Sequence, residues 1–310
     1  MARAASLLPD DDVELDGDEP AGPVDLDPPP PPWIDPATVR VRFSNLRQMA
    51  RSGLHYAAAC QGDGGETLSR RLGSGAHAML LGTPVVKWLE PTKDGRKIAP
   101  RSSKSKAWPA FKAKHPGAVI LTPAEWRAAE RMVNAIKSHR LARELLEGAS
   151  YELEINWSHE LGANDNRPGR ACSSHLDVYR CGALVADFKT ARELDPDRFR
   201  KIAVWSQYHA QLAFYRQAAA RGLGDVPDLA ARIIGVENAP PHDVICYELD
   251  AELLEDGAGL CDTWMRRLLA CEDDRVWPGR SAAAVRLGRL TDDDFTPPAN
   301  FTIEPQEIAA

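Results

Sequence analysis

Two aspartates and a lysine, on two neighbouring segments of the chain, are the residues best suited to chemistry. Asp177 lies in residues 175–179, and Asp187 and Lys189 lie in the apolar, partly β-branched residues 184–190. Side chains two apart on a strand share a face, so Asp187 and Lys189 point the same way. The glycine-containing turn between the segments predicts a hairpin that brings Asp177 beside them.

This set of side chains favours metal-dependent hydrolysis of a phosphodiester bond. Two nearby carboxylates repel each other unless a cation lies between them, and oxygen ligands suit Mg²⁺ or Mn²⁺. The lysine can orient a water or stabilise the charge that develops on a phosphate. An Asp-x-Lys pattern taken alone is more often a solvated strand edge. The apolar strand around it and the second aspartate, ten residues earlier, favour the functional interpretation.

A polar helix face follows the two strands. Tyr208, Gln211 and Tyr215 recur at intervals of three and four, so they share one side of a helix. A purely structural face would usually carry leucine or isoleucine, whereas these side chains offer hydrogen bonds to the carboxylates of the sheet. The alternative is a packing helix with half-buried tyrosines.

The remaining elements alternate in a way that predicts an α/β or α+β core, with a mixed sheet flanked by helices. Residues 87–114 are basic with few apolar positions, which predicts a long mobile loop, and residues 162–169 are expected to form a turn. Helices are expected over residues 45–59, 72–81, 123–147, 196–222 and 251–270, and strands over residues 151–157, 175–179, 184–190, 233–237 and 244–249.

Charge and composition divide the chain into three parts. Residues 1–36 hold ten acids and one base, together with a proline run, a composition typical of a disordered tail. Removing the tail's nine net negative charges from the total of −7 leaves a body of about +2, which is compatible with binding nucleic acid. We therefore expect an acidic tail over residues 1–36, one folded domain over residues 37–280, and a loosely ordered tail over residues 281–310.

Composition also excludes several classes of protein. No run of 18 apolar residues is present among the 310, which argues against a membrane span, and the N-terminus lacks the basic-then-apolar pattern of an export signal. The six cysteines form no Cys-x-x-Cys pair, so zinc or iron–sulfur ligation is not indicated and a reducing cytosol fits.

Together these motifs resemble the PD-(D/E)XK nuclease superfamily. More narrowly, they resemble the phage and prophage nucleases of the exonuclease VIII type, which are related to the RecB nucleases. The resemblance covers roughly residues 40–280 and implies a restriction-endonuclease-like core. The motifs that carry it are Gly73-Ser74-Gly75-Ala76-His77, Leu121-Thr122, Asp177, Asp187-Phe188-Lys189-Thr190, Tyr208 to Tyr215 and Trp277-Pro278-Gly279.

The resemblance assigns roles residue by residue. It implies that Asp177, Asp187 and His77 hold the metal, Mg²⁺ or Mn²⁺, and that Lys189 is the catalytic lysine. On an otherwise apolar helix, His77 would more often be a core histidine, and the family match reverses that interpretation.

Further site residues follow from the same resemblance. Gln211 and Tyr215 would line the site beside the DNA. Glu152 matches the acid that holds a water at the metal or a second ion. Glu154 lies on the same strand face, so it remains an alternative to Glu152.

Two positions depart from the pattern of the family. Close relatives tend to have an arginine and a proline just before the first aspartate, where this chain has residues 172–176. The second acid is Asp187 rather than the commoner glutamate, and the superfamily accepts either. Neither departure removes a ligand.

The resemblance implies a metal-dependent exonuclease that acts on double-stranded DNA in phage-type recombination, in the cytoplasm of a bacterial host. It further implies a homo-oligomer and a partner single-strand annealing protein. The alternatives are a structure-specific endonuclease of the same fold and a catalytically silent DNA-binding module. The intact Asp177, Asp187 and Lys189 argue against the silent module.

Overall fold

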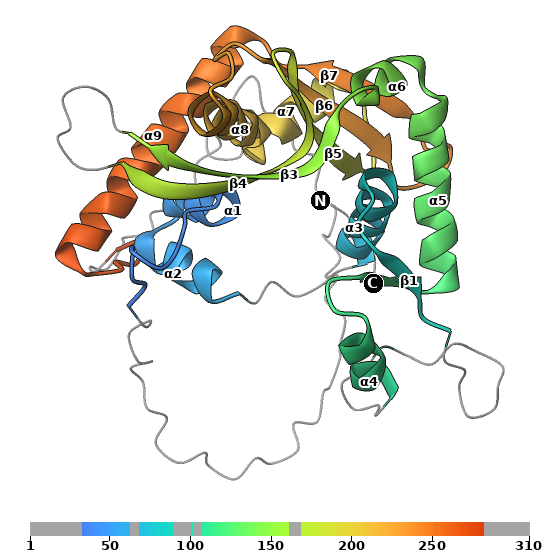
Figure 1. Cartoon of the computed structure of the whole chain (residues 1–310), viewed down its shortest axis with the longest axis horizontal. Helices are drawn as coiled ribbons and strands as arrows, with labels where there is room; N and C mark the ends of the chain where they lie inside the picture. The colour runs from blue at the N-terminus through green and yellow to red at the C-terminus, as the bar shows by residue number, and fades with distance from the viewer. Residues whose placement is uncertain (1–32, 63–67, 90–100, 102–106, 161–168, 282–310) are drawn as a thin grey trace, which may run out of the picture.

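A five-stranded mixed sheet lies at the centre of the structure, which is a computed structural model (Figure 1). The strands lie side by side in chain order. β5 and β6 run parallel, and the other neighbouring pairs run antiparallel. The strands are β3 (Ser150–His159), β4 (Arg170–Arg180), β5 (Leu184–Ala191), β6 (Ala230–Glu237) and β7 (Val244–Glu248).

The structure describes residues 33–62, 68–89, 101, 107–160 and 169–281. Within them the expected mixed sheet and its five strands are confirmed. No helix of this part of the chain is long and apolar enough to span a membrane. Most of the expected turn over 162–169, much of the basic segment 87–114 and nearly all of both expected tails lie outside the described residues.

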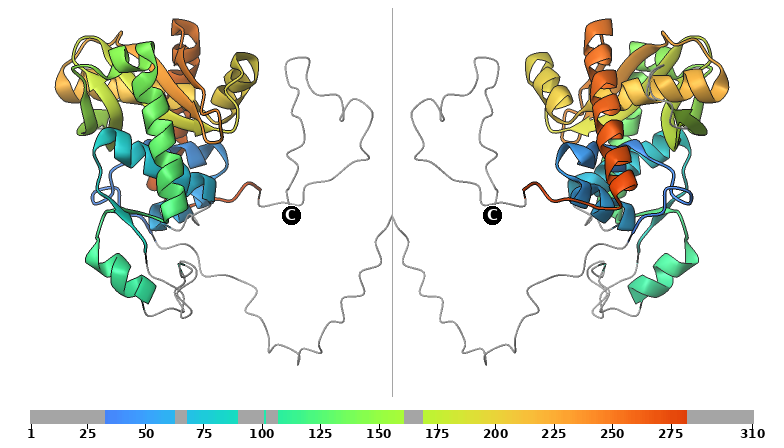
Figure 2. Two further views of the ribbon diagram at one scale, coloured as in Figure 1. Left: turned by 90° about the vertical axis from the view of Figure 1, so that its right-hand side faces the viewer. Right: turned by 90° about the vertical axis from the view of Figure 1, so that its left-hand side faces the viewer.

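Helices cover both faces of the sheet (Figures 1 and 2). On one face, α8 and α9 enclose what we call the α8 core, which includes Leu176, Val185, Leu212, Phe214 and Trp264. On the other face, α3 and α5 enclose the α5 core, which includes Met132, Ile136, Val178, Ala186 and Phe188. The helices are α3 (Leu68–Leu81), α5 (Pro123–Ser138), α6 (Arg140–Leu146), α7 (Pro196–Trp205), α8 (Tyr208–Leu223) and α9 (Ala251–Asp274).

Strand β5 is buried on both faces, because helices cover both sides of it. Val185 packs in the α8 core, whereas Ala186 and Phe188 pack in the α5 core. Strand alternation therefore directs Asp187 and Lys189 towards α8, as the sequence predicts.

The N-terminal segment differs from the single helix expected over residues 45–59. It forms α1 (Phe43–Leu46), a 3-10 turn and α2 (Gly53–Gln61), with a break at Ser52. The Ser52 Oγ accepts the His55 N–H at 3.3 Å and so caps α2. Within the expected tail over residues 1–36, Ile34 is buried and the Trp33 ring stacks on Trp277 at 5.5 Å, so this part of the segment packs on the folded domain.

Two long helices expected from the sequence are each divided in two by local capping or backbone geometry. His139 separates α5 from α6, and its Nδ1 accepts the N–H of Ala142 at 3.2 Å. Gln207 separates α7 from α8 and adopts a left-handed conformation with φ 63°. Histidine and glutamine do not usually mark the end of a helix. The helical periodicity on either side of each residue therefore predicted one continuous helix.

The basic segment expected to be a loop contains regular structure where it is described. β1 (Val85–Lys87) pairs in parallel with β2 (Val119–Leu121), and α4 (Ala107–Lys114) lies below them in Figure 1. Trp108 and Phe111 of α4 pack edge-on against the buried Trp88, with ring centroids 5.2 and 5.1 Å away. The few apolar residues in this segment include three aromatic residues that pack on one another. This packing explains why regular structure forms where the small number of apolar positions predicted a loop.

Helices α8 and α9 approach each other closely at Gly257. A Cβ at this position would lie 2.7 Å from the carbonyl carbon and oxygen of His209 and 2.8 Å from the nitrogen of Ala210. These are backbone atoms of α8, which cannot move aside as a flexible side chain could. Gly257 therefore sets the distance between α9 and the helix that carries Gln211 and Tyr215.

We expect Gly257→Ala to destabilise the fold by roughly 1–3 kcal/mol, because the added methyl group forces α9 away from α8. Gly259→Ala is the matched control, since a Cβ there meets nothing within 4 Å. The control should stabilise α9 by about 0.5–1 kcal/mol through helix propensity. Urea unfolding of both variants measures the difference, and equal effects would contradict the close approach.

Candidate functional site

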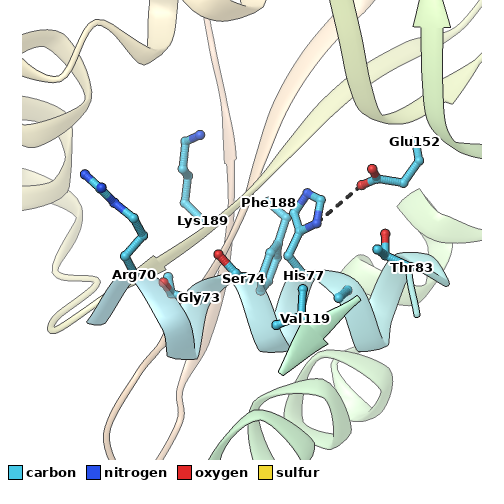
Figure 3. Close-up of a pocket in the computed structure, with 11 residues that line it drawn as sticks. Arg70, Gly73, Ser74, His77, Thr83, Val119, Glu152, Phe188 and Lys189 are labelled. Carbon is cyan, nitrogen blue, oxygen red and sulfur yellow. Dashed lines mark ion pairs between the residues drawn. The ribbon is translucent and has the colours of Figure 1, made fainter. Parts of the chain in front are cut away.

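His77 of α3 lies between two carboxylates of the sheet. Its Nε2 is 3.0 Å from Asp177 Oδ1, and its Nδ1 is 3.3 Å from Glu152 Oε1. The three side chains come from α3, β4 and β3, which are far apart in the sequence. Figure 3 shows the imidazole and Glu152 pointing towards each other above α3. The predicted meeting of His77 with Asp177 is therefore present.

Glu152 reaches this position through an unusual backbone conformation. Its φ is 52°, in the left-handed region that residues with a Cβ rarely adopt and that costs of order 1 kcal/mol or more. Its second oxygen, Oε2, is 3.3 Å from His175 Nδ1. Glu154, the alternative acid, instead accepts a hydrogen bond from Ser173 Oγ at 3.2 Å. The structure thus places Glu152 and not Glu154 at His77.

Strand β4 is irregular at the same level. Leu176 packs in the α8 core and Val178 in the α5 core, although residues two apart on a strand ordinarily share a face. The change falls at Asp177, which lies across from Glu152 between the paired residues of β3 and β4. Asp177 Oδ2 accepts the N–H of Phe188 at 2.9 Å, just beyond the last paired residues of β4 and β5. Irregular strands of this kind re-aim side chains beside active sites.

A second network joins Asp187 to α8. Lys189 Nζ is 2.5 Å from Asp187 Oδ2 and donates to Gln211 Oε1 at 3.1 Å. The Gln211 amide in turn donates to Asp187 Oδ1 and to the Tyr215 hydroxyl, both at 2.9 Å. The lysine nitrogen also lies 4.7 Å from the centre of the Tyr208 ring. The polar helix face therefore contacts the sheet as predicted, and Gln211 is the residue that reaches the carboxylate.

Burial and charge shift the pKa values in the first network. Burial lowers the pKa of His77, but the hydrogen bond to Asp177 and the surrounding carboxylates raise it above its usual value. Burial raises the pKa of Asp177, and His77 together with the Phe188 N–H more than offsets this and lowers it. The lowered pKa of Asp177 favours its ionised form, and the raised pKa of His77 favours a protonated ring beside it.

The second network shows the same competition. Burial raises the pKa of Asp187 to about 6, and the charge of Lys189 offsets this only in part. Burial lowers the pKa of Lys189, but the Asp187 carboxylate raises it above its usual value. The pair is therefore ionised at neutral pH, with the lysine charged and fixed in position. Burial also raises the pKa of Tyr215, which keeps its hydroxyl protonated.

Both networks border one hollow of about 630 Å³. His77, Glu152 and Lys189 line it, and Asp177 and Asp187 lie beneath it at His77 and Lys189. No role follows from the sequence for His175, which approaches Glu152, or for Arg70 and Ser74, which line the hollow. For His175, the sequence did offer a signal, because this residue lies two positions before Asp177 on the same predicted strand.

The side chains at His77 fit a divalent cation. Ligand atoms of His77, Glu152 and Asp177 all lie within 4.8 Å of one another. A neutral imidazole carries one N–H and can donate to only one of the two carboxylates, so either a second proton on the ring or a cation among the three side chains would satisfy the other. Among the described residues, Glu152 Oε1 has no hydrogen-bond partner beyond its ion pair with His77. Asp187, one of the three predicted ligands, is not part of this group and is held by Lys189 and Gln211 instead.

Comparison with known proteins points to one family. The family described as a PDDEXK-like domain of unknown function matches residues 42–287. The fold is similar to that of a candidate exonuclease from Eubacterium rectale, with a TM-score of 0.54, 15% identity, and coverage of 83% of this chain and 92% of that chain. At this identity the likeness shows the fold alone. No curated protein matches the chain significantly.

A further solved structure is less similar. A phage-related exonuclease from Haemophilus somnus 129PT is 12% identical, with 76% of this chain and 96% of that chain covered. Its TM-score of 0.31 is too low to support an argument from likeness.

The left-handed backbone at Glu152 can be tested by comparing glycine with alanine at two positions. Glu152→Gly should be more stable than Glu152→Ala by about 1 kcal/mol, because glycine adopts a positive φ without strain. At Glu154, which is not among the residues with positive φ, the order should reverse, since glycine weakens a strand. Urea unfolding of the four variants gives the comparison. Glycine proving less stable than alanine at both positions would contradict the geometry.

Proposed function

The chain belongs to the family of PDDEXK-like domains, and on that premise we propose that it is a divalent-cation-dependent nuclease that hydrolyses phosphodiester bonds of DNA. The single observation that supports this most is the shared hollow. There the His77–Glu152–Asp177 group lies beside a charged Lys189 that Asp187 and Gln211 hold in place.

In this proposal His77, Glu152 and Asp177 hold the cation, which is Mg²⁺ or Mn²⁺ because the ligands are mainly carboxylate oxygens. When bound, the cation supplies positive charge that polarises the scissile phosphate. Asp177 keeps one oxygen on the Phe188 N–H, so its other oxygen is directed at the cation position. The protein thus contributes a set of ligands that is preorganised before the substrate binds.

Lys189 is proposed to orient the attacking water and to stabilise the negative charge that develops on the phosphate. Its ammonium group is fixed by Asp187, Gln211 and the Tyr208 ring, so it need not reorganise during the reaction. Tyr215 fixes the amide of Gln211 and therefore acts by positioning. Asp187 in this arrangement acts by positioning Lys189, with which it forms an ion pair.

We extend the proposal to the ends of double-stranded DNA as the substrate. The resemblance to exonuclease VIII-type enzymes supports this choice, as it supports a role in phage-type recombination with a single-strand annealing partner. A DNA substrate also fits the basic residues around the hollow, since phosphate contacts supply most of the affinity for nucleic acid. An endonuclease of the same fold would differ in cutting DNA that has no ends.

We expect Asp177→Ala, Glu152→Gln and Lys189→Ala each to lower DNA cleavage by at least about 100-fold, because the first two remove a ligand of the cation and the third removes a positive charge that would stabilise the transition state. Release of nucleotides from linear duplex DNA in Mg²⁺, with EDTA as the cation-free control, is the measurement. A closed circular duplex of the same sequence distinguishes the two modes of cutting. An exonuclease leaves the circle intact, whereas an endonuclease opens it.

Glu154→Gln is the matched control, since Glu154 lies on the same strand and contacts Ser173 instead of His77. It should retain cleavage within about twofold of the unsubstituted protein. Thermal unfolding with and without Mn²⁺ provides an independent measurement, because a bound cation stabilises the folded state. The Asp177→Ala protein should lose that stabilisation. Wild-type turnover by the Lys189→Ala protein would overturn the mechanism.

A further inference from the structure

The hollow has two chemically different ends. At one end lie Glu152 and His77, with Asp177 behind them. At the other end lie Arg70, Ser74 and Thr190, with Lys189 between the two. In Figure 3 the Arg70 guanidinium and the Ser74 hydroxyl point to the same side of α3 as Lys189. Arg70, Ser74 and Thr190 give this end a basic and hydroxyl-bearing lining.

Helix geometry aligns these groups with the cation site. Arg70, Ser74 and His77 are spaced by four and three residues, so they form one stripe along α3. At a rise of about 1.5 Å per residue, Arg70 lies roughly 10 Å along the helix axis from His77. One strand of a duplex carries a phosphate for about every 3.4 Å of axis, so a strand that places a phosphate at His77 places others within reach of Arg70.

The close packing of α3 on β5 fixes this stripe. A Cβ at Gly73 would lie 2.8 Å from Thr190 Oγ1, so a larger residue would require the Thr190 side chain or α3 to shift. The approach holds Arg70 and Ser74 beside Lys189, on the strand that also carries Asp187. The Arg70 end therefore borders the same hollow as His77, Glu152 and Lys189.

We propose that Arg70 and Ser74 form a phosphate subsite that binds a backbone phosphate a few nucleotides from the scissile one on the same DNA strand. The inference rests on the proposed nuclease function and identifies its substrate as a polynucleotide rather than an isolated phosphodiester. The planar guanidinium donates two parallel hydrogen bonds to phosphate oxygens, and the hydroxyl adds a third. These contacts hold the strand in register and carry no information on base sequence.

A comparison of two substrates tests the subsite. Linear duplex DNA has neighbouring phosphates, whereas bis(p-nitrophenyl) phosphate has one phosphodiester and none beside it. Arg70→Ala should lower kcat/KM on DNA by about 10-fold, mainly through KM, because a charge-assisted phosphate contact is lost. Its loss on DNA should exceed its loss on the small ester several-fold. Arg70→Lys should recover part of the DNA activity, and Ser74→Ala should lose less than Arg70→Ala.

Arg140→Ala is the matched control, because it removes an arginine from α6 that is 86% exposed and pairs with Glu144. It should leave both activities unchanged. An equal loss on DNA and on the small ester in the Arg70→Ala protein would overturn the subsite, since that result indicates a general effect on the fold or on Lys189.

Binding without catalysis keeps this inference separate from the proposed function. The affinity for duplex DNA, measured in EDTA, should decrease as the salt concentration rises. For Arg70→Ala this decrease should be less steep, and the difference in slope should correspond to about one phosphate contact. An unsubstituted protein that binds DNA but cleaves neither substrate contradicts the proposed hydrolysis. An unchanged salt dependence in the Arg70→Ala protein contradicts the phosphate subsite.

Discussion

The contact of His77 with Asp177 and Glu152 is the interaction on which the site depends. It joins a helix from the first quarter of the chain to the two strands that follow 70 or more residues later. These three side chains come together only when α3, β3 and β4 are all in place. The site is therefore a product of the complete tertiary fold, and no single segment contains it.

Much of β5 could be predicted from the sequence, because strand alternation fixes which way Asp187 and Lys189 point. The helical spacing of Tyr208, Gln211 and Tyr215 likewise predicted a polar face, and the structure places Gln211 on Asp187. Both predictions depend only on the periodicity of side chains along a strand or a helix. That periodicity gives the correct direction of a side chain wherever the element is regular.

The features that were missed arise where regular structure is interrupted. Ser52 and His139 cap new helices with their side chains, and Gln207 takes a left-handed backbone, so three expected helices are divided. The choice between Glu152 and Glu154 also depended on such an interruption. Regular alternation gives both acids the same face, and only the positive φ of Glu152 separates them. Periodicity carries no information about a single irregular residue that tertiary contacts impose.

The N-terminal segment covers a part of the sheet that would otherwise be an open edge. Val41 pairs in parallel with Cys172 on the side of β4 away from β3, where β4 extends beyond the pairing with β5. Its N–H donates to the Ala171 carbonyl at 3.0 Å, and its carbonyl accepts the Ser173 N–H at 2.9 Å. An exposed edge of that kind is a template for pairing with another chain. A few residues of extended backbone thus close the sheet against self-association through this edge.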